Sequence, residues 1–406
     1  MDRVVITGLG IVSAIGVGKQ EFWKNALNGT CGTSEVTSHD TSGFENHRGG
    51  EIKDLDPNPF LSQEDASRLE RGSIMAIMAA KMAVEDAVLD LKKENLQRVG
   101  ISMGTTLGEV QALEKADRVW LRGGQDKIRA SLLQQYPSGN IPANMAKELG
   151  VSGLNIMIPN ACAAGNFAIG YAFDLIRSFK ADLMLAGGAD PFSWIPFTGF
   201  NRVGAVSHDV VRPFDRDSTG MMVGEGAAVL VLEPLEKALE RKARIYAEVM
   251  GYGISCDAIH ITAPHPESRG LIQAMNFALK WSSLKPEQID CVIAHGTGTP
   301  TNDRAEMLAL TQVFGDRAKD LPVTSIKSML GHSMGAASAI EALTNALAVY
   351  HNLIPPTINY RTPLPDFDID VVANKCREKQ ITFGMNNALA FGGNNSSLIL
   401  GTYTKE

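Results

Sequence analysis

Short apolar runs rich in β-branched residues alternate with longer amphipathic segments along the whole chain. Residues 71–91 and 268–284 carry apolar side chains at every third or fourth position, which predicts helices. The short runs have the length and composition of strands. We expect strands within residues 3–10, 98–106, 155–161, 182–189, 227–234, 245–253, 289–296, 322–328 and 395–403. This alternation predicts an α/β layered architecture.

The charged segment at residues 234–249 follows one apolar block and leads into another, so we divide the chain into halves at 1–245 and 246–406. The two halves share a loose similarity, because "NACAAGNFAIGYAFDLI" and "VTSIKSMLGHSMGAASAIEALTNAL" each lead through small residues into an apolar helix. The pattern alone leaves duplication and coincidence open. If duplication is real, Cys162 and His332 occupy equivalent places near two helix N-termini.

Charge and cysteine content exclude several classes of protein. The net charge of -7 argues against a nucleic-acid partner. Five scattered cysteines without CxxC pairs or Cys/His clusters predict no metal site and indicate a reducing compartment. No run of eighteen apolar residues predicts a membrane span, so we expect a cytoplasmic protein.

No cofactor is expected either. The start of the chain half-resembles a dinucleotide-binding loop, but Ser13 replaces the third glycine and no acid ends a second strand about 20 residues on. We expect Gly8 and Gly10 to end the first strand in a turn.

Cys162 lies where a predicted strand gives way to a helix that is apolar on nearly every side. A lone cysteine is usually a small buried hydrophobe. At the first turn of a helix, however, unpaired N–H groups would lower the thiol pKa and bind an oxyanion. The site therefore suits acyl transfer.

Histidines follow two further strands. His295 ends an apolar strand, before a loop in which Thr297 and Thr299 could line a channel. We expect the next helix to begin at Asp303, and Asn302 or Asp303 could simply cap it. His295 itself could only satisfy a hydrogen bond in the core. Lys327 and His332 precede a helix whose internal acid, Glu341, needs a cation if it is buried, and Lys327 is a candidate.

The last motif is "FGGNN", at residues 391–395, which predicts a tight turn before the final strand. Alone it would be an ordinary bend. Together with one cysteine, two histidines and one lysine at element ends, it fits a carbanion-forming reaction on a thioester.

The motifs "NACAAG", "HGTGTPTND", "KSMLGHSMGAA" and "FGGNN", in this order, resemble the β-ketoacyl-acyl carrier protein synthases over essentially the whole chain. The resemblance implies a thiolase-type fold, in which two similar βαβαβαββ halves form five layers (αβαβα), usually in a two-fold dimer. It also implies decarboxylative condensation of an acyl group with malonyl-acyl carrier protein.

The resemblance further implies a role for each residue. Cys162 is the nucleophile, the N–H groups of Cys162 and Phe391 form the oxyanion hole, and the Phe391 ring gates the acyl pocket. His295 and His332 stabilise the malonyl enolate. Lys327, Glu341 and Asp303 support the two histidines. Thr297 and Thr299 bind pantetheine.

Two departures affect what the resemblance implies. Ala388, Leu389 and Ala390 replace the usual Ser-Phe-Gly before the gate, which puts acyl preference in question. The usual basic docking helix keeps only Arg68 and Arg71, opposed by Glu64 and Asp65. These departures favour a type II polyketide or polyene pathway over housekeeping fatty-acid elongation. The partner of the chain is then an identical copy or a chain-length-factor-like sister. A decarboxylase-only enzyme and a non-catalytic chain-length partner remain alternatives.

Overall fold

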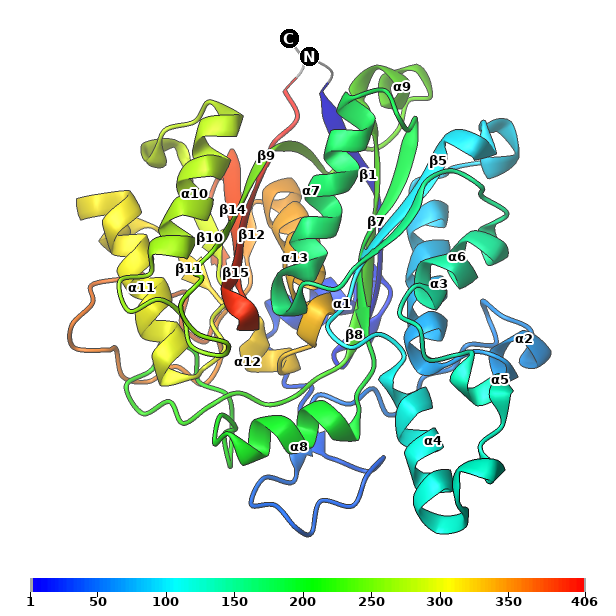
Figure 1. Ribbon diagram of the computed structural model, residues 1–406. Coiled ribbons are helices and arrows are strands. Elements are labelled where there is room, and N and C mark those ends of the chain that lie inside the picture. Colours follow the sequence, from blue (N-terminus) through cyan, green and yellow to red (C-terminus); the bar gives the residue numbers. More distant parts are fainter. Residues whose placement is uncertain (1–2, 405–406) are drawn as a thin grey trace.

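The computed structural model describes residues 3–404 and contains one large sheet flanked and divided by helices (Figure 1). The main strands are β1 (Val4–Ser13), β5 (Val99–Gly104), β6 (Asn155–Ile158), β7 (Leu183–Asp190), β8 (Gly226–Pro234), β9 (Ala247–Cys256), β10 (Cys291–Ile293), β11 (Val323–Thr324), β14 (Phe383–Leu389) and β15 (Asn394–Gly401). Their order across the sheet is β11-β10-β14-β15-β9-β1-β8-β7-β5-β6.

This order repeats a single topology on either side of one strand pair. The strands β6-β5-β7-β8-β1 mirror β11-β10-β14-β15-β9, with parallel and antiparallel pairings at the same places in both sets. The two sets join where β1 and β9 pair antiparallel, with Val4 opposite Val249. Each set has the predicted βαβαβαββ order, so duplication is the correct reading of the loose similarity.

Helices fill the three remaining layers. The principal ones are α3 (Arg71–Asp86), α6 (Asn140–Leu149), α7 (Ala164–Arg177), α10 (Arg269–Ser282), α11 (Pro300–Phe314) and α13 (Ala337–His351). The pair α3 and α6 covers one outer face, α10 and α11 cover the other, and α7 and α13 lie side by side in the middle (Figure 1). The predicted five-layer arrangement is therefore confirmed.

Smaller elements complete the chain. They are α1 (Lys19–Leu27), α2 (Gln63–Ser67), α4 (Val110–Gly123), α5 (Ala130–Leu133), α8 (Trp194–Arg202), α9 (Leu235–Glu240), α12 (Lys327–Leu330), β2 (Gly16–Val17), β3 (Ser34–Glu35), β4 (Arg48–Gly49), β12 (Leu353–Ile354) and β13 (Arg377–Glu378). None of the helices within residues 3–404 combines the length and apolarity needed to cross a bilayer.

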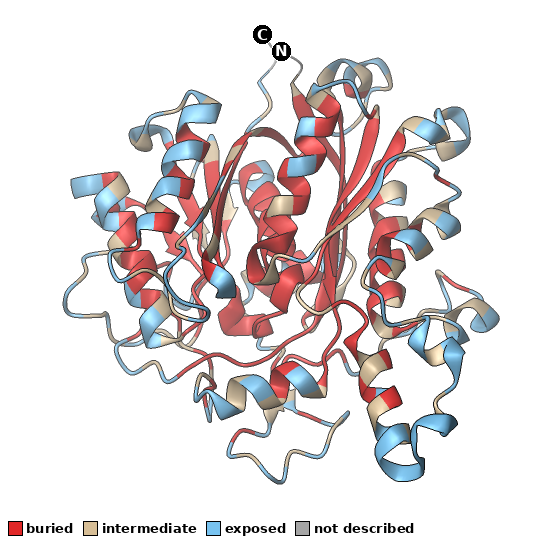
Figure 2. Cartoon of the chain, in the orientation of Figure 1, coloured by how far each residue is buried: buried red, intermediate tan, exposed pale blue. Residues whose placement is uncertain are grey.

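The middle helix α13 is deeply buried. Every residue of α13 from Ala337 to Val349 is buried, as expected for a helix with apolar side chains all round (Figure 2). Separate hydrophobic cores lie beneath the two outer pairs of helices. The middle helices therefore form a rigid support for whatever their N-termini carry.

Three local predictions were wrong. Gly8 and Gly10 do not end the first strand; they lie inside β1, where a Cβ on Gly10 would come within 1.8 Å of the Ala79 carbonyl oxygen of α3. The strand β14 was missed because its sequence, FGMNNAL, lacks β-branched residues and buries two asparagines. The helix α11 begins at Pro300, before Asp303.

The register of the duplication also differs from the prediction. A short 3₁₀ turn precedes each middle helix, η4 (Ala161–Ala163) before α7 and η7 (Met334–Ala336) before α13. Each turn opens with a non-glycine residue at positive φ, 47° at Ala161 and 51° at Met334. Cys162 therefore corresponds to Gly335, and His332 lies three residues earlier in its own copy.

Candidate active site

Four strand ends bring the candidate residues to one place. Cys162 follows β6, His295 follows β10, Lys327 and His332 follow β11, and Phe391 follows β14. The carboxyl ends of parallel strands meet at one edge of a sheet, which is where α/β proteins bind ligands. A cavity of about 270 Å³ opens there, and its walls include Cys162, Phe200, Val203, His295, Thr297, Thr299, His332 and Phe391.

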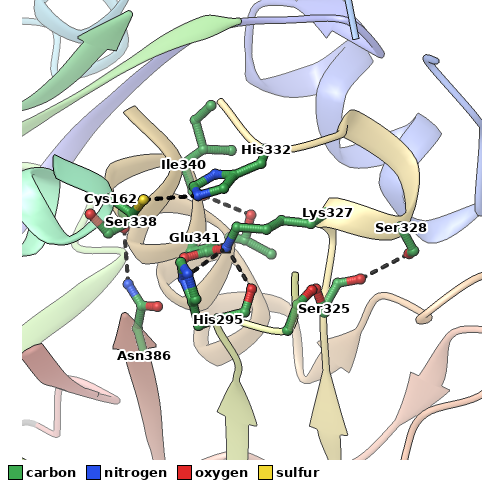
Figure 3. A network of polar contacts seen from close by, with 12 residues as sticks. Cys162, His295, Ser325, Lys327, Ser328, His332, Ser338, Ile340, Glu341 and Asn386 are labelled. Atoms are coloured by element: carbon green, nitrogen blue, oxygen red, sulfur yellow. Dashed lines mark hydrogen bonds and ion pairs between the residues drawn. The ribbon is translucent and has the colours of Figure 1, made fainter. Parts of the chain in front are cut away.

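The Cys162 thiol is buried and lies 3.0 Å from Nε2 of His332 (Figure 3). Ala161, directly before it, holds the strained φ of 47° that turns the chain from strand to helix. Burial raises the pKa of the Cys162 thiol to about 12, although the nearby Lys327 charge opposes this shift. The predicted lowering of the thiol pKa by the helix N-terminus is therefore wrong, because desolvation outweighs the helix dipole here.

The two imidazoles meet edge to face, with ring centroids 5.3 Å apart. Burial, aided by the positive charge of Lys327, holds the pKa values of His295 and His332 well below the ordinary value. Both rings are therefore neutral at physiological pH. Nζ of Lys327 lies 3.3 Å from Nδ1 of His295, so the ammonium donates to Nδ1 and the ring proton is on Nε2.

Lys327 is buried and has two further partners. It forms an ion pair with Glu341 of α13 and donates to the carbonyl oxygen of His295 over 2.6 Å (Figure 3). Burial raises the pKa of Glu341 to about 8, with the Lys327 charge acting in the opposite direction. The predicted pairing of Lys327 with Glu341 is confirmed.

Two acids of α11 hold the loop that carries His295. Glu306 accepts the backbone N–H groups of His295 and Gly296, both over 2.8 Å, and burial raises its pKa to about 7. Asp303 accepts the N–H of Phe214 over 2.7 Å and that of Gly298 over 3.2 Å, so it braces this loop and does not cap its own helix. Sequence reasoning gave Glu306 no role, although its spacing of three from Asp303 places both acids on one helix face.

The turn that carries Phe391 forms one side of the cavity. Gly392 and Gly393 have φ values of 80° and 74°, which glycine adopts without strain. The Phe391 ring packs against Phe200 of α8, with the ring centroids 5.5 Å apart and the ring planes tilted by 43°, a contact for which the sequence held no signal. On another wall, the hydroxyl groups of Thr297 and Thr299 lie 2.8 Å apart.

The two arginines predicted to dock a carrier protein lie outside this cavity and differ from each other. Arg68 is exposed and forms an ion pair with Glu64, one helical turn away. Arg71 is largely withdrawn from solvent, since its guanidinium contacts both oxygens of the buried Glu225 and the carbonyl oxygen of Ile52. Arg71 is thus engaged in holding the fold together.

The ligand atoms of Cys162, His295 and His332 all lie within 4.8 Å of one another, a spacing that could also hold a metal ion. The ammonium of Lys327 beside His295 would raise the free energy of a bound cation and lower that of an anion. The site therefore suits a developing oxyanion better than a metal.

Comparisons with known proteins show the family of the chain. Residues 1–238 match the model of the β-ketoacyl synthase N-terminal domain, and residues 246–361 match that of its C-terminal domain. The 3-oxoacyl-[acyl-carrier-protein] synthase 2 of Synechocystis is 37% identical over 99% of this chain and 98% of its own. The enzyme of the same name from Staphylococcus aureus is 37% identical over 98% of this chain and 97% of its own.

Solved structures give the same result. A chain of the ishigamide ketosynthase/chain length factor superposes with a TM-score of 0.95 at 42% identity, covering 99% of this chain and 100% of that one. A β-ketoacyl synthase from Burkholderia phymatum gives a TM-score of 0.92 at 31% identity, covering all of both chains. The chain belongs to the β-ketoacyl synthase family. It is a condensing enzyme of the acyltransferase class, in fatty-acid or polyketide synthesis.

Proposed function

We propose that Cys162 takes an acyl group from an acyl carrier protein and that the acyl-enzyme condenses with malonyl-acyl carrier protein. The product is a β-ketoacyl chain longer by two carbons, and CO2 is released. The observation that carries this proposal is the 3.0 Å contact between the thiol and His332, with His295 facing the same cavity.

In the first step the Cys162 sulfur attacks the acyl thioester carbonyl. His332 takes the thiol proton and returns it to the departing pantetheine sulfur, so both groups are neutral before and after the step. The N–H groups of Cys162 and Phe391 stand at the starts of short 3₁₀ turns, where no partner within the turn is available, and they bind the oxyanion. Each such hydrogen bond stabilises a transition state by about 2.7–4 kcal/mol.

In the second step the malonyl thioester loses its carboxylate as CO2, and the electron pair of the broken bond forms an enolate. Nε2–H of His295 donates to the enolate oxygen, and so does Nε2–H of His332 once that nitrogen has taken up a proton from solvent. The enolate carbon then attacks the acyl carbonyl on Cys162, and the Cys162 sulfur leaves and takes the proton from Nε2 of His332, so each condensation consumes one proton from solvent. Lys327, Glu341 and Asp303 act as positioning residues, while Thr297 and Thr299 bind the pantetheine arm.

The proposal assigns the nucleophile to the half at residues 1–245 and the histidines, lysine and gate to the half at 246–406. It includes a cytoplasmic location, which the five unpaired cysteines support. A polyketide or polyene pathway is favoured over fatty-acid elongation, since the ishigamide protein shares 42% identity and the two 3-oxoacyl synthases share 37%. A dimer with an identical chain or with a chain-length-factor-like sister completes the proposal, because one solved relative is a ketosynthase/chain length factor.

Intact mass spectrometry tests the first step. Incubation with an acyl carrier protein should add one acyl group, which Cys162→Ala should abolish. Cys291→Ala is the matched control and should keep the adduct, since Cys291 is also buried but lies in β10 outside the cavity wall. An adduct that survives Cys162→Ala would refute the nucleophile.

Product analysis tests the second step. Adding malonyl carrier protein to the acyl-enzyme should release CO2 and give one elongated chain per CO2. Release of CO2 without elongation would instead support a decarboxylase-only enzyme, and failure of the wild type to acylate at all would support a non-catalytic partner.

A further inference from the structure

Four buried polar side chains lie next to the turn that carries Cys162, and the proposed reaction uses none of them. They are Asn166 on α7, Ser338 on α13, Asn386 on β14 and Ser396 on β15, each no more than 1% exposed. Burying a side-chain amide raises the free energy of the folded state unless the amide is hydrogen-bonded. These residues bond to one another, and we call them the amide network.

The side chain of Asn166 binds both strands of the hairpin that carries Phe391. Its Nδ2 donates to the carbonyl oxygen of Asn386 in β14 over 3.3 Å and to Oγ of Ser396 in β15 over 3.2 Å. Its Oδ1 accepts Nδ2–H of Asn386 over 2.9 Å. The turn between these strands, residues 390–393, contains Phe391. Since Asn166 lies one helical turn after Cys162, it connects the two N–H groups of the proposed oxyanion hole.

Other contacts of the amide network hold the two middle helices together. The backbone N–H of Asn166 donates to Oγ of Ser338 over 3.1 Å, and Nδ2 of Asn386 donates to the carbonyl oxygen of Ser338 over 2.9 Å (Figure 3). A Cβ on Gly165 would lie 2.5 Å from the backbone nitrogen of Ala339, so α7 and α13 are in close contact here. The backbone of Asn166 thus holds the helices, whereas its side chain holds the hairpin.

We propose that Asn166 is a positioning residue that sets the distance between the N–H groups of Cys162 and Phe391. Both side-chain amide hydrogens of Asn166 and of Asn386 have acceptors, and a bonded buried network of this kind is rigid and directional. The inference rests on the proposed function, because it takes these two N–H groups to bind the oxyanion. Without the Asn166 side chain the hairpin can move relative to Cys162, and a displacement of about 1 Å can slow a reaction about a hundredfold.

Asn166→Ala tests this role through two reactions of the same thiol. Acylation by an acyl-pantetheine thioester passes through an oxyanion, whereas iodoacetamide loses iodide to the sulfur without forming one. Acylation, followed by rapid quench and intact mass spectrometry, should slow at least about tenfold. Alkylation should stay within about twofold of the wild-type rate, because it depends on the contact between Cys162 and His332, which the variant keeps.

Asn345→Ala is the matched control. Asn345 is also fully buried, and its Nδ2 donates to the carbonyl oxygen of Gly384 over 2.9 Å, so it joins α13 to the same strand β14. It lies seven residues after Ser338, about 10 Å further along the helix. The control variant should lower Tm, as Asn166→Ala should, but its acylation rate should equal that of the wild type.

Asn386→Ala breaks the same contact from the strand side, so it tests the proposal if Asn166→Ala does not fold. The double variant should be acylated as fast as the slower single variant, because both changes remove one interaction. An unchanged acylation rate in the single variants would overturn the proposal. So would an equal loss of acylation and alkylation, because the amide network would then only stabilise the fold.

Acylation of the wild type separates this inference from the proposed function. Its absence would refute the proposed nucleophile. Equally fast acylation of the wild type and of Asn166→Ala would refute the positioning role alone.

Discussion

Replacing His332 by asparagine should change how the reactivity of Cys162 depends on pH. In the wild type a neutral imidazole lies 3.0 Å from the thiol, so the proton passes from sulfur to nitrogen within the site. Alkylation of Cys162 by iodoacetamide should therefore be nearly level between about pH 6.5 and about pH 9, where both groups are neutral at rest. In His332→Asn the proton must go to solvent, and the rate should rise about tenfold per pH unit.

The magnitude follows from the thiol pKa. With burial raising the pKa of Cys162 to about 12, roughly one thiol in ten thousand is ionised at pH 8. An ordinary cysteine, with a pKa of about 8.5, would be about one quarter ionised at that pH. His332→Asn should therefore react about a thousandfold more slowly than a free cysteine at pH 8. Asparagine is close to histidine in size, so the site should stay largely dry.

The assay is site-resolved mass spectrometry of the labelled thiols at timed intervals across the pH range. Cys291 serves as the internal control, because burial raises the pKa of its thiol to about 12 as well but it does not face the cavity. It should remain unlabelled while Cys162 reacts. The assignment of His332 as proton acceptor would be refuted if the labelling rate of Cys162 depended on pH in the same way in the wild type and in His332→Asn. It would also be refuted if the labelling rate of the variant were level below about pH 9.

Three further predictions concern residues around this pair. Lys327→Met removes the positive charge that, with burial, lowers the pKa of both histidines, so their pKa values should rise and the rate of acylation should fall as the pH drops below about 6.5. The pH profile of kcat/KM measures this, and Lys327→Arg, which keeps the charge, should not lose activity at acidic pH. Arg71→Leu leaves Glu225 buried without its partner and should lower the free energy of unfolding by about 3 kcal/mol or more, measured as a lower Tm. KM for a carrier-bound substrate, divided by KM for the same acyl group on pantetheine, should stay the same, and a rise in this ratio would contradict the internal role of Arg71. Gly392→Ala forces alanine to a φ of 80° and should lower the free energy of unfolding by about 1 kcal/mol. Acyl transfer, measured by rapid quench, should slow because the turn that carries Phe391 is distorted, and an unaltered rate would show that the turn is not part of the gate.

Sequence patterns located the site because each reactive residue follows a strand. Cys162, His295 and Lys327 come shortly after β6, β10 and β11, and those carboxyl ends meet at one edge of the sheet. A reader of the sequence can therefore bring together residues that are far apart in the chain. The same reasoning missed β14, since its buried asparagines hide the apolar pattern of a strand.

Properties that depend on burial could not be read from the sequence. The pKa of Cys162 is set by desolvation, and the helix N-terminus that suggested a thiolate is too weak to reverse it. The engagement of Arg71 with Glu225 joins residues separated by 154 positions, so a surface role looked equally reasonable. Both properties were missed for one reason, since local sequence does not report how far a group lies from water.

The corrected register of the duplication explains why only one half carries a nucleophile. Gly335, the counterpart of Cys162, donates its N–H to Asp190 of the first half over 2.6 Å, and the same carboxylate accepts the N–H of Thr106 over 2.8 Å. A Cβ on Gly335 would lie 2.4 Å from the carbonyl carbon of Thr105, so no side chain fits there. The 3₁₀ turn before α7 thus presents the Cys162 thiol, whereas the equivalent turn before α13 binds the two halves to each other. This contact also positions His332, three residues before Gly335, beside the Cys162 sulfur.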